Sequence, residues 1–169
     1  MVTSKRPLGF AIHIKRERFK FSCAHMTVFP DGSKERLHGH NYYLSLSLKL
    51  KDIAFKNMVD FSPLKKAMAE LCLEWKERTF IATQNPFYEE LRNTAEELEF
   101  KLCDKRYVFP KEDVCLLPID NAAVEPLANY ALEWLVKKLD TLIEKSPIVQ
   151  MVVTVEENPG QGASAMKDF

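Results

Sequence analysis

Three of the chain's four histidines lie close together, at His25, His38 and His40. His38 and His40 are separated only by Gly39, so they project from the same face of an extended strand, because side chains alternate along a strand. Three imidazoles from two adjacent strands can bind a divalent metal ion and leave a fourth position open. That ligand count is typical of a catalytic zinc site. The alternative is that each histidine is a separate surface or core residue.

Two extended segments must position these histidines. In residues 10–24 alternate side chains are apolar, and a change of parity predicts a bulge in residues 15–18. Residues 41–50 alternate in the same way and predict a second strand. A polar loop with a Pro-Asp-Gly turn signal lies between them. We expect the two strands to pair antiparallel and to bring the three histidines together.

The rest of the chain predicts two helices and further strands. Residues 62–75 carry one apolar stripe, with Ser62 as the N-cap, and residues 120–142 carry another, with Asp120 or Asn121 as the cap. Residues 98–109 indicate a short hairpin, and residues 148–155 are rich in β-branched residues and predict a strand. The stretch 158–162 is typical of a loop.

Composition narrows the class of protein. The 169 residues carry 24 basic and 24 acidic side chains, with 46% hydrophobic residues, as in an ordinary globular domain. We expect a single domain over residues 1–169. No basic block or long apolar run suggests a nucleic-acid or membrane partner. The four cysteines show no paired close spacing, which favours a reducing, cytoplasmic setting.

These elements predict an α+β fold in which amphipathic helices cover one face of an antiparallel sheet. The other face of the sheet then still needs cover, so we expect a homo-oligomer.

Several runs resemble the 6-pyruvoyl-tetrahydropterin synthase and 6-carboxytetrahydropterin synthase family, nearly over the whole chain and in order. The matching runs are Phe21-Ser22-Cys23-Ala24-His25, His38-Gly39-His40-Asn41-Tyr42, Met58-Val59-Asp60-Phe61, Asn121 to Ala128 and Thr154-Val155-Glu156. The resemblance implies a tunnelling (T-fold) subunit with a four-stranded antiparallel sheet and two helices, here with a short inserted hairpin. It also implies hexamers built from two trimers, with active sites between subunits.

The resemblance further implies residue roles. Zinc would be held by His25, His38 and His40, and the pterin ring would be gripped by Glu156, since a carboxylate can accept two N–H bonds from the edge of an amino-pyrimidine. Without the family pattern, Glu156 would be read as a solvated residue at a strand end.

The chain departs from the family at the acid–base residues. Members carry a cysteine four or six residues before the first motif histidine, where this chain has Lys34 and Gly32. It offers Glu35 instead, which resembles a branch that cleaves dihydroneopterin triphosphate to 6-hydroxymethyl-7,8-dihydropterin. Glu35 can equally be one charge of a solvated loop.

A second departure follows the first helix. Members carry an Asp-His pair there, and this chain has Lys76 and Glu77. Glu77 can act as an acid or base if burial raises its pKa, or it can belong to the polar end of a helix. Cys23, two residues before His25, can be a thiol near the metal or a small core residue.

The implied function is therefore a zinc-dependent lyase acting on the C6 side chain of dihydroneopterin triphosphate or a related pterin, by triphosphate elimination or by carbon–carbon cleavage. The main alternative is a zinc and pterin binder that has lost the proton relay and does not catalyse. A third hypothesis is a zinc cyclohydrolase on the same type of subunit, which would need Cys23 as a ligand.

Overall fold

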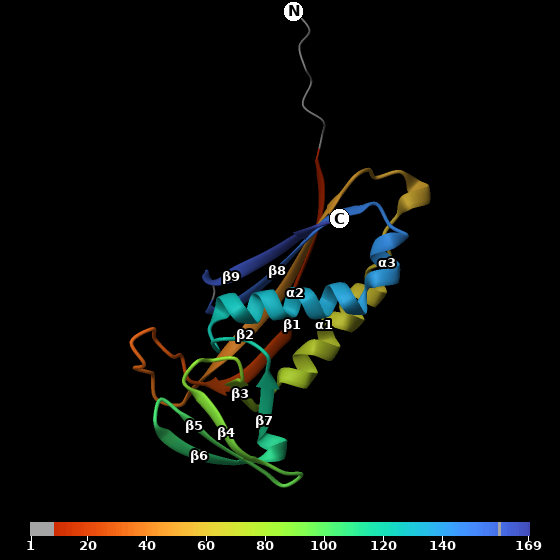
Figure 1. Ribbon diagram of the computed structural model, residues 1–169. Coiled ribbons are helices and arrows are strands. Elements are labelled where there is room, and N and C mark those ends of the chain that lie inside the picture. Colours follow the sequence, from red (N-terminus) through yellow and green to blue (C-terminus); the bar gives the residue numbers. More distant parts are fainter. Residues whose placement is uncertain (1–8, 159) are drawn as a thin grey trace, which may run out of the picture.

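The computed structural model describes residues 9–158 and 160–169. Its main sheet has the strand order β7-β3-β1-β2-β8-β9 and carries two long helices on one face (Figure 1). The strands of this sheet are β1 (Phe10–His25), β2 (His38–Leu50), β3 (Arg78–Ala82), β7 (Val114–Leu117), β8 (Ile148–Asn158) and β9 (Gln161–Asp168). The α-helices are α1 (Phe61–Trp75), α2 (Val124–Lys138) and α3 (Asp140–Glu144), and two 3₁₀ turns are Phe55–Asn57 and Lys111–Asp113.

The predicted α+β architecture is confirmed, and the sheet is larger than expected. Strands β1, β2, β8 and β9 form the four-stranded antiparallel part. Strands β3 and β7 extend it in parallel from the β1 edge. In the stretch 158–162, β8 ends at Asn158 and β9 starts at Gln161, so a tight turn replaces the expected longer loop. Gly160 lies in this turn with a φ of +85°, a conformation that favours glycine.

Strands β1 and β2 pair in a register that brings the three histidines close together. His25 lies opposite His38, and Cys23 lies opposite His40. The register shifts between Lys15 and Lys20, which confirms the predicted bulge. Because the bulge switches parity, the apolar side chains on both sides of it face the helices.

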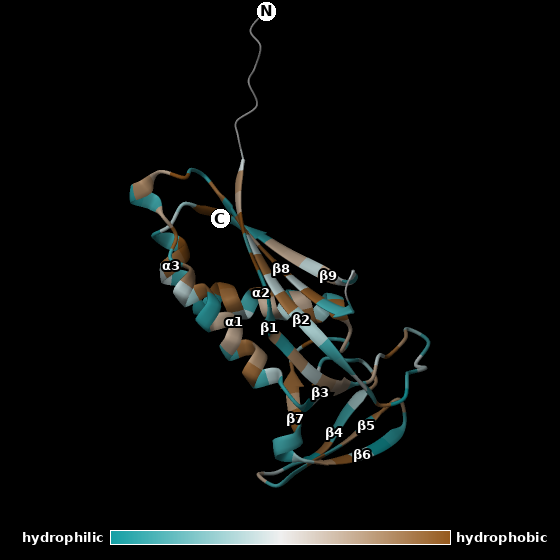
Figure 2. Cartoon of the chain, turned by 180° about the vertical axis from the view of Figure 1, so that it is seen from behind, coloured by the Kyte–Doolittle hydropathy of each residue, from teal (hydrophilic) through white to brown (hydrophobic). Residues whose placement is uncertain are grey.

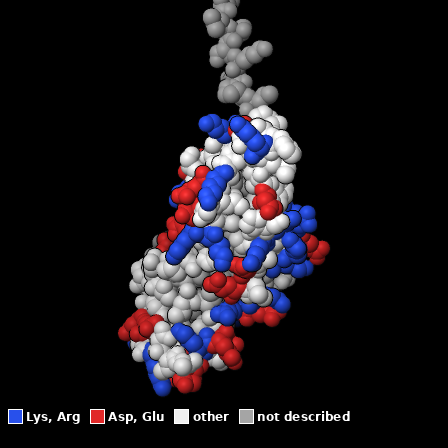
Figure 3. Space-filling model, turned by 90° about the vertical axis from the view of Figure 1, so that its right-hand side faces the viewer, with Lys and Arg blue, Asp and Glu red and all other residues white. Residues whose placement is uncertain are grey.

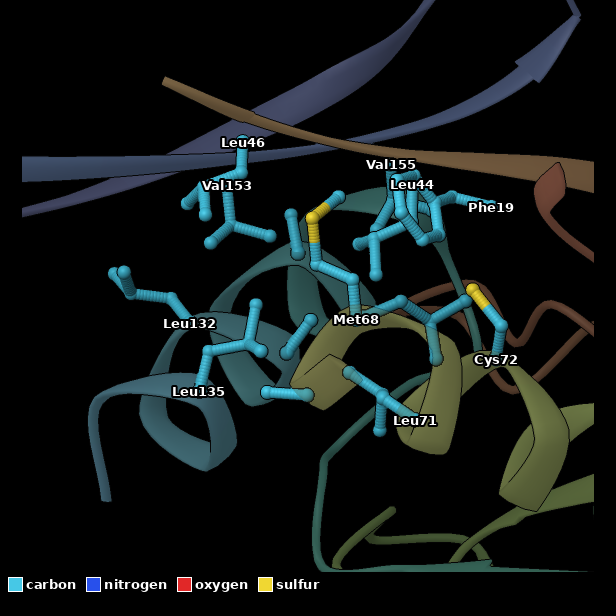
Figure 4. Packing of buried hydrophobic residues seen from close by; sticks show 14 of the residues in the cluster. Phe19, Leu44, Leu46, Met68, Leu71, Cys72, Leu132, Leu135, Val153 and Val155 are labelled. Atoms are coloured by element: carbon cyan, nitrogen blue, oxygen red, sulfur yellow. The ribbon is translucent and has the colours of Figure 1, made fainter. Parts of the chain in front are cut away.

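The core lies between the sheet and the helices. Strands in Figure 2 change hydropathy from residue to residue, since one side faces the helices and the other does not. Figure 4 shows the two layers meeting, with β2 and β8 on one side and α1 and α2 on the other. The labelled side chains include Leu44, Leu46, Met68, Leu71, Leu132, Leu135, Val153 and Val155, all buried.

The helix boundaries differ from the predicted ones. Helix α1 begins at Phe61, and its N-cap is Asp60 instead of Ser62: the Asp60 carboxylate accepts the backbone N–H of Ser62 at 2.8 Å. Helix α2 begins at Val124 and ends at Lys138, short of the predicted end at residue 142. The remaining apolar positions continue in α3, which packs as a separate short helix.

A second sheet lies beyond the ends of β1 and β3 (Figure 1) and consists of β4 (Tyr88–Asn93), β5 (Glu97–Leu102) and β6 (Lys105–Pro110). The hairpin β5–β6 was predicted, but β4 was not, because its residues are almost all exposed and give no apolar alternation. The second core under this sheet consists of Met26, Val28, Ile81, Leu98, Phe100, Leu102 and Val114.

Basic and acidic side chains are interspersed on the face drawn in Figure 3. This mixture gives that face no field of a single sign. Among the described residues, no helix is both long enough and apolar enough to cross a bilayer.

Candidate metal centre and active site

The three histidines predicted as metal ligands converge where β1 ends and β2 begins. One ligand nitrogen from each of His25, His38 and His40 lies within 4.8 Å of the other two. The cause is the strand register: His25 and His38 are cross-strand partners, and His40 lies two residues further on the same face. A Cβ atom on Gly39 would lie 3.2 Å from the Cys23 carbonyl oxygen, so glycine allows the strands to approach closely here.

Backbone carbonyls orient two of the rings. His25 Nδ1 donates to the Ala122 carbonyl at 2.7 Å, and His38 Nδ1 donates to the Arg36 carbonyl at 2.7 Å. A proton on Nδ1 leaves Nε2 unprotonated, and an unprotonated ring nitrogen is the one that can bind a metal ion. Burial lowers the pKa of His25, and the neighbouring imidazoles add to this effect, so its neutral form is favoured. The donor set therefore fits a divalent ion that prefers imidazole nitrogen.

Glu35 lies beside this cluster. Its Oε2 atom is 3.9 Å from His38 Nε2, and its side chain is 42% exposed. A hydrogen bond from the Thr27 side chain lowers the pKa of Glu35, and the nearby His38 adds to the effect. The backbone N–H of Glu35 also donates to the Thr27 carbonyl at 2.9 Å. The structure thus holds an ionised carboxylate, able to accept a proton, next to the imidazoles.

The other two acid–base candidates have different surroundings. Glu77 lines a hollow of about 600 Å³ together with His40, but its side chain is 70% exposed and lies 3.1 Å from the Lys76 ammonium. Glu77 also has a φ of 59°, directly after the C-cap of α1. Cys23 is buried, which raises the pKa of its thiol to about 12 and keeps it protonated. These surroundings are those of a helix-end residue and of a small core residue.

Glu156 does not face the histidines. It pairs across the strands with Tyr43, and its carboxylate is 2.5 Å from Lys15 Nζ, on the face of the sheet away from the helices. The next residue, Glu157, faces the cluster instead: its Oε1 is 3.0 Å from His40 Nε2, and its side chain is 21% exposed. Sequence reasoning missed Glu157, although it continues the buried alternation that includes Val153 and Val155.

Two further groups escaped the sequence analysis. The Tyr42 hydroxyl is 3.1 Å from His25 Nε2 in a fully buried position. Asn121, predicted as a possible helix cap, instead bonds both backbone groups of Val28 and the N–H of Ala122, the residue whose carbonyl orients His25. No periodicity in the sequence indicates the contacts of Tyr42 with His25 and of Asn121 with Val28, because their partners lie 17 and 93 positions apart.

Fold and site together define a subunit of the T-fold class with a three-histidine candidate metal centre at a strand end. The model of the 6-pyruvoyl tetrahydropterin synthase family matches residues 13–168. The chain belongs to this family. Its members are oligomeric lyases of pterin biosynthesis.

Individual relatives agree with this assignment. The chain is 35% identical over 150 residues to a Methanocaldococcus jannaschii protein provisionally named a 6-carboxy-5,6,7,8-tetrahydropterin synthase, covering 88% of this chain and 90% of that protein. The Plasmodium falciparum 6-pyruvoyl tetrahydropterin synthase superposes with a TM-score of 0.87 at 25% identity, over 95% of this chain and 99% of that one. Two Plasmodium vivax variants, in which a glutamate named as a catalytic residue is replaced, superpose with TM-scores of 0.85 at 27% identity, over 96% of this chain and 100% of each of those.

Proposed function

We propose that this chain is a zinc-dependent lyase that acts on the C6 side chain of dihydroneopterin triphosphate or a closely related pterin. The observation that carries the proposal is the carboxylate of Glu35 beside three convergent imidazoles. The glutamate named as catalytic in the Plasmodium vivax relative supports a glutamate in this role. We assign the whole chain to one domain that contains this site.

The residues divide the work as follows. His25, His38 and His40 would hold the zinc ion, which would supply Lewis acidity toward the oxygens of the pterin side chain. The Oε2 atom of Glu35, 3.9 Å from His38 Nε2, would accept the proton released from that side chain, because the carboxylate is ionised at neutral pH. We leave Glu77 outside the proton transfer, because it is exposed and paired with Lys76.

We assign the pterin-anchoring role to Glu157 in place of Glu156. Glu157 lies on the histidine face, where its Oε1 atom is 3.0 Å from His40 Nε2 and its side chain is 21% exposed, against 14% for Glu156. Glu156 lies on the opposite face, where it is engaged by Lys15. A shielded carboxylate next to the metal centre is suited to two N–H bonds from a pterin edge.

The test is to incubate the zinc-loaded protein with dihydroneopterin triphosphate and to identify the pterin product by chromatography and mass spectrometry. Glu35→Gln should lower kcat by about 10²–10⁴-fold with normal zinc content, as for loss of a general base. The exposed Glu133→Gln on α2 is the matched control. Undiminished turnover in Glu35→Gln would contradict the proposed role.

Glu157→Gln and Glu156→Gln form a second matched pair. We expect Glu157→Gln to raise KM for the pterin more strongly, by about tenfold or more, since it weakens a charge-assisted contact. A larger effect of Glu156→Gln would restore the assignment made from the sequence.

The second candidate function is a zinc and pterin binder without catalysis. It is favoured by the exposed position of Glu77, which leaves the second acid–base position of the family without a shielded group. It predicts tight pterin binding and no product from dihydroneopterin triphosphate, so the same incubation separates the two functions.

We further propose that the chain assembles as a hexamer of two trimers in a reducing, cytoplasmic compartment. Support for assembly comes from the segment before α1, where Phe55 is 90% exposed and Met58 is 78% exposed, because such apolar exposure marks interaction surfaces. The four free cysteines agree with the compartment. Native mass spectrometry measures the assembly directly.

A further inference from the structure

Glu35 sits in a loop, residues 27–36, that has little regular structure of its own. Its backbone is joined by one β-bridge between Val28 and Lys34, in which the Phe29 N–H donates to the Ser33 carbonyl at 2.8 Å and the Glu35 N–H donates to the Thr27 carbonyl at 2.9 Å. A tight turn closes the tip, where the Gly32 N–H donates to the Phe29 carbonyl at 2.9 Å. Loops of this kind open at low free energy unless other elements hold them. Because proton transfer needs a group placed within hydrogen-bond reach, something must hold this loop against the histidines.

Lys34, the neighbour of Glu35, connects the loop to the second sheet. Its ammonium lies 5.3 Å from the centroid of the Tyr107 ring on β6, within the range of a cation–π contact. The same ammonium donates to the Glu35 carbonyl at 3.1 Å and lies 3.6 Å from the Met26 sulfur. One side chain therefore joins β6 directly to the backbone of Glu35.

A second contact lies at the tip of the loop. The backbone at Gly32 has a φ of +80° and passes so close to Phe87 that an added Cβ would lie 3.1 Å from the ring. Phe87 directly precedes β4, and its carbonyl accepts the N–H of Cys103 at 3.2 Å. The tip of the loop thus touches Phe87 at Gly32, while Phe29, Pro30, Asp31 and Ser33 are exposed.

The part of the second sheet that contacts the loop is itself well packed. Tyr107 stacks on Phe100 with ring centroids 5.3 Å apart, and Phe100 is fully buried. Val28, at the start of the loop, belongs to the same buried cluster as Phe100 and Leu98. A packed cluster of this kind resists displacement, because each ring has few alternative positions.

We propose that the sheet β4–β6 is a clamp that holds Glu35 in position at the histidine cluster, with Lys34 and Tyr107 as positioning residues. The proposal rests on the role of Glu35 proposed above. It gives the second sheet a function in addition to lining the hollow beside His40 with Phe109. Of the histidines, His25 is oriented through Ala122 near α2, whereas His38 is oriented by the Arg36 carbonyl at the end of this loop.

The test removes each side of the cation–π contact in the zinc-loaded full-length protein. The disruptive variants are Lys34→Met and Tyr107→Leu, and the conservative partners are Lys34→Arg and Tyr107→Phe, which keep a cation and a ring. Lys138→Met is the matched control, because Lys138 lies 5.5 Å over Trp134 on α2, far from the site. The readouts are hydrogen exchange of peptides covering 27–36, zinc content, and kcat and KM with dihydroneopterin triphosphate.

We expect exchange of 27–36 to accelerate about fivefold in both disruptive variants, as for loss of a partly desolvated cation–π contact. We expect kcat to fall about tenfold, with KM and zinc content changed less than about twofold, because misplacement of an acid–base group slows the chemical step. The conservative variants and Lys138→Met should behave like the wild type. If Tyr107→Leu unfolds the second sheet, hydrogen exchange of residues 97–110 will be fast. The proposal is then tested with Lys34→Met alone.

Two results would overturn the clamp: exchange of 27–36 that is unchanged in Lys34→Met, or faster exchange with full kcat. If the wild type itself makes no product, the proposed function fails. The clamp is then judged by exchange alone, so the two failures are distinguishable.

Discussion

Asn121 offers the sharpest test of how the fold builds the candidate metal centre. Its Oδ1 accepts the N–H groups of Val28 at 3.0 Å and Ala122 at 3.1 Å, and its Nδ2 donates to the Val28 carbonyl at 3.0 Å. The Ala122 carbonyl in turn accepts the Nδ1 proton of His25. Asn121→Ala therefore removes three hydrogen bonds and releases the group that orients the His25 ring.

The magnitude follows from these bonds. Each contributes about 1 kcal/mol net, and Asn121 is only half-buried, so water replaces part of what is lost. We expect the free energy of unfolding of the metal-free protein to fall by about 2 kcal/mol. Loss of a partner that orients a ligand costs about 10–100-fold in metal affinity. Since Asn121 acts on His25 through Ala122, we expect the lower end, about tenfold.

Urea unfolding of the metal-free protein measures the first quantity, and zinc competition with a chelator measures the second. Asn129→Ala is the matched control: Asn129 is exposed on α2 and its side chain donates to Glu133 at 3.2 Å, so the substitution should change the free energy of unfolding by less than about 0.5 kcal/mol. A loss of stability with zinc affinity within about twofold of the wild type would refute the link from Asn121 to His25.

Three further outcomes are expected. Glu77→Gly should raise the free energy of unfolding by about 1 kcal/mol in urea, because glycine removes the strain of a left-handed backbone after α1; an unchanged or lower value would contradict this. The Lys15 ammonium lowers the pKa of Glu156, so the pair stabilises the protein above the ordinary glutamate pKa and loses this effect as the pH falls through the lowered value. Lys15→Met should therefore lower the free energy of unfolding by up to about 1 kcal/mol at pH 7 and leave it unchanged near pH 2. An equal loss at both pH values would refute the pairing argument. Met68→Ala in the main core should lower the free energy of unfolding by about 3 kcal/mol in urea. A loss below about 1 kcal/mol would mean that neighbouring side chains move to fill the cavity.

Much of the fold was predictable because local patterns and global packing agree. The alternation in β1 and β2, with its bulge, reflects one buried face, and the stripes of α1 and α2 reflect the other layer of the same core. Strands β4 and β9 gave no such signal, since most of their residues are exposed at edges of sheets. The positions of β4 and β9 depend on backbone hydrogen bonds with neighbouring strands, and an apolar pattern in the sequence does not indicate such bonds.

The spacing of His25, His38 and His40 along the chain was enough to indicate a shared metal ion, because alternation on two paired strands determines which side chains meet. What only the tertiary structure decided is everything that reaches this cluster from elsewhere. The hydrogen bond from His25 Nδ1 to the Ala122 carbonyl, the contact of Glu157 with His40 and the contact of Lys34 with Tyr107 all join segments that are distant in sequence. Their distances depend on how the layers pack, and no local period encodes them.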